Sequence, residues 1–89
     1  MSDAKPELPV IDFSNFVLSL AATAMVQLGL VPDPESGETV EINLPIAQHT
    51  IDTLAMLREK TQGNLDDEEE KLLDSMLYEL RMRFVEAGK

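Results

Sequence analysis

The most unusual feature of the chain is an uncharged stretch of 19 residues from Phe13 to Val31. Its polar residues recur at every fourth position, at Asn15, Ser19, Thr23 and Gln27. Steps of four residues drift by only about 40° around an α-helix, so these side chains form one narrow stripe on an otherwise apolar surface. We predict a helix over about 14–28, which begins after Asp12 or Ser14 and ends at Gly29.

Two further helices are predicted from apolar residues at helical spacing. The second covers about 45–62: Pro45 suits a first turn, and Gly63 follows its end. Its apolar stripe consists of Ile46, Ala47, Ile51, Leu54, Ala55 and Leu57. The third covers about 67–86, and Asp66 and Glu69 have the spacing of a capping box at its start. Its apolar stripe consists of Leu72, Leu73, Met76, Leu77, Leu80 and Phe84.

The link between the first two helices is rich in turn-forming residues, and it then alternates apolar and polar residues over Thr39–Leu44. This alternation predicts a short strand or an extended packing arm over 39–44. A strand needs a partner, and the candidates are Leu8–Asp12 or a second copy of the chain. Residues 1–11 are predicted to be a flexible tail, and 12–87 a single helical domain.

The fold class that follows is all-α, a small three-helix bundle with an extended or β segment near 39–44. Two amphipathic helices cannot cover every side of a first helix that is apolar around most of its circumference. We therefore predict that a second copy completes the bundle, in a homodimer or a higher homo-oligomer. The predicted contact residues lie on the first helix: Phe16, Leu20, Ala21, Ala24, Met25 and Leu28.

Composition narrows the classes of function. The chain has 89 residues, and its 17 acidic and 7 basic residues give a net charge of −10, which argues against a nucleic-acid partner. With no cysteine, it has no disulfide, thiolate metal site or cysteine nucleophile. The uncharged stretch forms a helix of roughly 22 Å, too short for a hydrocarbon core of roughly 30 Å, and its flanks are acidic. We therefore expect no membrane span and, without a convincing signal peptide, a cytoplasmic location.

Candidate chemistry is sparse. The single histidine, His49, could act with Asp52 or Asp74, but no motif of a serine hydrolase, a zinc protease or a phosphate-binding loop accompanies it. The acidic run 66–70 is explained by its place in the first turn of a helix. We therefore predict a protein that is not an enzyme, with no catalytic residues, no cofactor and no metal.

Several short segments, in a fixed order, resemble a bacterial family, the domain of unknown function numbered 1844. They are Phe16–Leu20, Gly29–Pro34, Asn43–Ala47, Ile51–Asp52, Lys60–Leu65, Glu68–Leu73 and Leu77–Phe84. The resemblance covers roughly 12–86 and implies a small helical bacterial protein with no established activity, so it transfers no catalytic residue. Members more often have Thr where this chain has Asp66, and either residue caps a helix.

The favoured function is a non-enzymatic, homo-oligomeric interaction or structural module. An unknown protein partner could dock on exposed segments such as Asn43–Ile46, Lys60–Asn64 or Tyr78–Arg81. The alternative is a small-molecule or lipid-binding protein with an apolar cavity lined by the first helix. A histidine-based enzyme and an electrostatic mimic of nucleic acid are weaker hypotheses.

Overall fold

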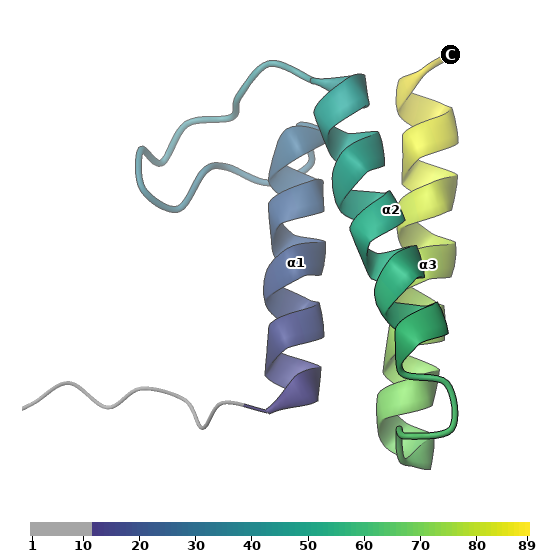
Figure 1. Ribbon diagram of the computed structural model, residues 1–89. Helices are drawn as coiled ribbons and strands as arrows, with labels where there is room; N and C mark the ends of the chain where they lie inside the picture. Colours follow the sequence, from purple (N-terminus) through teal and green to yellow (C-terminus); the bar gives the residue numbers. More distant parts are fainter. Residues whose placement is uncertain (1–11) are drawn as a thin grey trace, which may run out of the picture.

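Three helices run up, down and up beside one another in a computed structural model, which describes residues 12–89 (Figure 1). They are α1 (Phe13–Gln27), α2 (Leu44–Lys60) and α3 (Asp67–Ala87). Each pair of helices is in contact, and residues 12–89 contain no strand. The predicted all-α three-helix bundle is thus confirmed, whereas the predicted tail, 1–11, lies outside the described residues.

Each helix begins at a side chain that caps it. The carboxylate of Asp12 accepts a hydrogen bond from the Asn15 amide at 2.8 Å, and the Asn43 side chain accepts one from the Ile46 amide at 3.1 Å. At α3 the predicted capping box is present in both directions: Asp66 accepts from the Glu69 amide, and Glu69 accepts from the Asp66 amide. These caps satisfy amides that have no partner inside the helix.

Replacing the cap of α3 should destabilise the bundle measurably. We expect Asp66→Ala to lower the free energy of unfolding by about 0.5–2 kcal/mol, because the Glu69 amide loses its acceptor. Urea unfolding followed by circular dichroism measures this change. Asp67→Ala is the matched control, since it removes the same charge from the same turn. If Asp67→Ala lowers the free energy of unfolding as much as Asp66→Ala does, the loss of charge, and not the loss of the cap, is responsible.

Gly29 ends α1, as predicted. Its φ is +74°, a left-handed conformation that glycine adopts without strain. The Gly29 amide donates to the Val26 carbonyl at 2.9 Å, and the Leu30 amide donates to the Met25 carbonyl at 3.0 Å. These two bonds form a Schellman motif, which turns the chain away from the helix axis.

The link between α1 and α2 is irregular. The strand expected over 39–44 does not form: 39–43 have no regular structure, and α2 already begins at Leu44. Instead the segment packs across the end of α1, where the Asn43 amide donates to the Gln27 carbonyl at 3.0 Å. A Cβ built on Gly29 would lie 3.0 Å from Cγ1 of Ile42, which shows how closely the two segments approach. The predicted strand is therefore wrong; Ile42 packs beside Gly29, but Val40 and Ile42 remain 36% and 50% exposed, so the segment adds little to the core.

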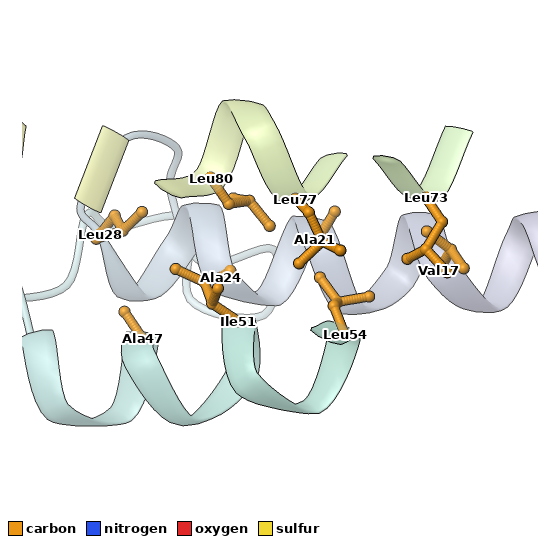
Figure 2. Close-up of a cluster of buried hydrophobic side chains, with 10 residues drawn as sticks. All are labelled: Val17, Ala21, Ala24, Leu28, Ala47, Ile51, Leu54, Leu73, Leu77 and Leu80. Carbon is orange, nitrogen blue, oxygen red and sulfur yellow. The ribbon is translucent and has the colours of Figure 1, made fainter. Parts of the chain in front are cut away.

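The core combines small and large apolar residues from α1 and α2 with leucines from α3. Ten apolar side chains converge from the three helices and are at most 6% exposed (Figure 2): Val17, Ala21, Ala24, Leu28, Ala47, Ile51, Leu54, Leu73, Leu77 and Leu80. Thr50 is the only buried polar residue among 12–89. Its hydroxyl lies 2.8 Å from Oε1 of Gln27, so the buried hydroxyl is satisfied by a bond between α2 and α1.

Candidate functional site

The six residues predicted to contact a second copy fall in different environments. Ala21, Ala24 and Leu28 are 4%, 0% and 2% exposed, because they face α2 and α3 within one chain. No second copy can reach them while the bundle is intact, so this part of the predicted interface is corrected. Leu20 and Met25 are half-buried against the core, and only Phe16 is exposed. The polar stripe of Asn15, Ser19 and Thr23 lies on the exposed side, so it marked the outward direction, which the predicted interface did not take into account.

The opposite side of α1 is uncharged and open to solvent. We call it the α1 outward face, and its exposed residues are Asn15, Phe16, Leu18, Ser19, Ala22 and Thr23. Phe16 and Leu18 are 47% and 45% exposed, although both are large apolar side chains. Two residues apart on the helix, they lie at opposite edges of this face, with Asn15, Ser19 and Thr23 between them. The face is thus an uncharged surface with a large apolar side chain along each edge, which another molecule can cover.

The hydroxyls on this face are already satisfied by their own helix. The Ser19 hydroxyl donates to the Phe16 carbonyl at 2.8 Å, and the Thr23 hydroxyl donates to the Ser19 carbonyl at 3.0 Å. Covering a polar group costs little when its hydrogen bond remains intact. The α1 outward face can therefore be buried against a partner more easily than its polar residues suggest.

A hollow of about 380 Å³ lies between the second half of α1 and the link that follows it. Its walls are Ala22, Thr23, Val26, Gln27, Asp33, Pro34 and Glu35. The carboxylate of Asp33 accepts from the Glu35 amide at 2.9 Å and holds this turn in place. The hollow thus has a floor from α1 that is half apolar, Ala22 and Val26, and half polar, Thr23 and Gln27, with an acidic rim from the link.

An ion-pair cluster joins α2 to α3. The Arg58 guanidinium lies 2.7 Å from Oδ1 of Asp74, through Nε, and 2.9 Å from Oε2 of Glu70, through Nη2. The hydrogen bond to Asp74, together with the charges of both carboxylates, raises the pKa of Arg58 above its ordinary value. The cluster is partly exposed, so we assign it a modest structural role. Spacing along the sequence does not predict this cluster, because its members belong to different helices.

The structure does not assemble the histidine site considered from the sequence. His49 is exposed on α2, but Asp52 accepts a hydrogen bond from Nε2 of Gln48 at 2.7 Å. Asp74 is engaged with Arg58. Within 12–89, no three Asp, Glu or His side chains lie together in a way that could hold a metal ion. None of the helices in this range combines the length and the apolar character needed to cross a bilayer.

A second exposed apolar surface lies on α3, within and beyond the segment Tyr78–Arg81 considered from the sequence. Tyr78, Met82 and Val85 are 69%, 43% and 60% exposed. They share a shallow groove of about 540 Å³ with Asp74, Leu77, Arg81 and Glu86. The spacing of Tyr78, Met82 and Val85 was a signal that sequence analysis did not use. The other two segments are also largely exposed, with Ile46 at 48%.

Comparison with known proteins gives one match. No curated protein and no solved structure matches the chain. The model of one family, described as a domain of unknown function (DUF1844), matches residues 10–86, which is most of the chain. The match confirms the resemblance seen in the ordered segments between Phe16 and Phe84. The chain therefore belongs to the DUF1844 family.

Proposed function

We propose that this protein is a non-enzymatic, homo-oligomeric interaction module that self-associates through the α1 outward face. The observation that carries the proposal is the exposure of Phe16 and Leu18, at 47% and 45%, on a helix with no charged residue. Burying such apolar side chains is favourable by roughly 25 cal/mol per Å² of apolar surface. A second copy offers an identical face, which a two-fold axis can place against the first.

Electrostatics support the choice of this face. Two copies each carry a net charge of −10 and repel each other, so contact is least unfavourable where charge is absent. The whole stretch from Phe13 to Val31 is uncharged, whereas the segment 32–44 carries four acids and no base. Approach through α1 therefore keeps most carboxylates of the two copies apart.

The non-enzymatic part of the proposal rests on the partners of Asp52 and Asp74, the two carboxylates considered with His49. Asp52 and Asp74 are hydrogen-bonded to Gln48 and Arg58, so neither orients the imidazole. We also place the protein in the bacterial cytoplasm, as the family resemblance implies. Deletion of the gene and complementation with the His49→Ala variant tests this part: full complementation is expected, and failure would point to a chemical role for His49.

The self-association is tested by light scattering behind a sizing column. We expect wild-type protein at micromolar concentration to show a mass of at least twice 9.9 kDa. Phe16→Glu places an unpaired carboxylate in the contact, once from each copy, and should raise the dissociation constant by roughly 100-fold or more. His49→Glu, also on an exposed helix face, is the matched control and should leave the mass unchanged. Wild-type protein that elutes as a 9.9 kDa monomer would refute the proposal.

The alternative function is binding of a small molecule or lipid along α1. The hollow beside Val26 and Pro34 supports it, since these residues and Ala22 give it an apolar part and its volume is about 380 Å³. Native mass spectrometry of protein as purified separates the two functions. A reproducible added mass that is lost in the Val26→Glu variant would favour ligand binding. A mass that is a whole multiple of the chain mass, with nothing added, would favour self-association alone.

A further inference from the structure

The side of α3 that faces away from the core presents both apolar surface and charge. We call Tyr78, Arg81, Met82 and Val85 the α3 stripe; all four are exposed, and they lie opposite the buried Leu73, Leu77 and Leu80. A tyrosine, a methionine and an arginine together form a composition that is enriched where proteins meet. The groove that these residues line is the larger of the two described above.

The charges along this stripe are incompletely matched within the chain. Glu86 lies 3.7 Å from Nη1 of Arg83. Glu70 and Asp74 share the single guanidinium of Arg58, which leaves this cluster with one excess negative charge. Arg81, by contrast, has no ion-pair partner among residues 12–89. An unmatched positive charge on Arg81 and an excess negative charge at Glu70 and Asp74 therefore lie on the same helix. Lys71 likewise has no ion-pair partner among residues 12–89, and Arg83 is shared by Glu79 and Glu86.

Helix geometry places these two charges on one flank of the stripe. Arg81 follows Asp74 by seven residues, which is close to two turns, so the two side chains lie on the same side and about 10 Å apart along the axis. When two identical helices pack antiparallel about a two-fold axis, the same flank of each helix lies against the other, and the residue numbers of the two helices run in opposite directions. With the axis near Tyr78, Arg81 then lies against the partner's Asp74, twice in each pair.

We infer that the α3 stripe binds the α3 stripe of a second copy in this antiparallel arrangement. Tyr78 lies against the partner's Tyr78 at the axis, and Val85 lies against the aliphatic stem of the partner's Lys71. Arg81 neutralises the excess charge of the partner's Asp74 and the partner's Glu70. The inference rests on the proposed self-association and adds a second contact to it, so that each chain carries two faces for its own copies.

Two different two-fold contacts on one chain produce an assembly larger than a dimer. If the two axes intersect at a right angle, the assembly closes at four chains; if they do not intersect, it grows into an open chain of subunits. The two contacts should also differ in chemistry, because the α1 outward face is uncharged and the α3 stripe depends on ion pairs. This difference allows each contact to be removed separately.

The test measures the masses of the wild type and four variants by light scattering under one set of conditions. We expect Arg81→Glu to reduce the wild-type assembly to a dimer held by α1, and Phe16→Glu to reduce it to a dimer held by α3. The double variant should have the mass of one chain, 9.9 kDa. Lys60→Glu, an exposed helix position with the same change in net charge as Arg81→Glu, is the control and should keep the wild-type mass.

A charge exchange adds a second, independent measurement. Asp74→Lys combined with Arg81→Glu reverses both partners of the cross-chain pair, so we expect it to restore the mass that Arg81→Glu alone loses. Failure of this rescue, or a Phe16→Glu protein that is already monomeric, would overturn the α3 contact and leave the proposed function standing. A Phe16→Glu protein of unchanged mass, with a monomeric Arg81→Glu protein, would instead overturn the α1 contact. Monomeric wild-type protein would overturn both.

Discussion

Leu54→Ala should lower the free energy of unfolding by about 2–5 kcal/mol, because it empties space in the centre of the core. Leu54 is 0% exposed and belongs to the cluster that all three helices share (Figure 2). A domain of this length is stable by only roughly 4–13 kcal/mol, so the loss is a large fraction of the total. Urea unfolding followed by circular dichroism should show a lower midpoint with an unchanged slope.

Met56→Ala is the matched control for this experiment. Met56 lies two residues further along α2 and is also a large apolar side chain, but it is 45% exposed. Its truncation should change the free energy of unfolding by no more than about 0.5 kcal/mol. If Leu54→Ala and Met56→Ala have equal effects, the side of α2 that faces α1 and α3 has been assigned incorrectly.

Ala24→Leu should also destabilise the bundle, by about 1–3 kcal/mol, but for the opposite reason. Ala24 is 0% exposed, so the larger side chain has no free space and must displace its neighbours. The change is measured as a lower melting temperature at a protein concentration where light scattering shows monomers only. This condition removes any contribution of self-association to the apparent stability.

Ala22→Leu makes the same substitution on the exposed side of the same helix. Because its Cβ points to solvent, we expect the unfolding of the monomer to be nearly unaffected. Above the concentration at which copies associate, the added leucine should strengthen the contact. Equal destabilisation by Ala22→Leu and Ala24→Leu would contradict the orientation of α1 in the bundle.

Local signals were sufficient to predict the helices. The start of α3 depends on Asp66 and Glu69, three residues apart, and the end of α1 depends on the conformation that Gly29 permits. Such features act within one turn of the chain, so they can be recognised without knowledge of the fold. The segment 39–44 was harder, because apolar alternation is compatible with a strand and with an arm that packs on a helix end.

The candidate surfaces could be predicted only in part. The apolar character of α1 indicated a contact beyond two helices, but Ala21, Ala24 and Leu28 proved to be the inward side. The polar stripe of Asn15, Ser19 and Thr23 proved to lie on the outward side and so indicated the rotation of the helix, but with no charged residue on α1 this signal was weak. The Arg58 cluster depends on how α2 and α3 are placed, which no spacing along the chain reveals, and so does the lack of an ion-pair partner for Arg81 among residues 12–89.

The unequal lengths of the two links bear on the order in which the bundle folds. Six residues, 61–66, separate α2 from α3, whereas sixteen residues, 28–43, separate α1 from α2. Closing the shorter link loses less chain entropy, by about 0.9 kcal/mol, and Arg58 adds an ion pair within the same hairpin. Folding is therefore favoured to start from α2 and α3, with α1 docking afterwards. The helix that joins the bundle last is then also the one whose outer side is offered to another chain.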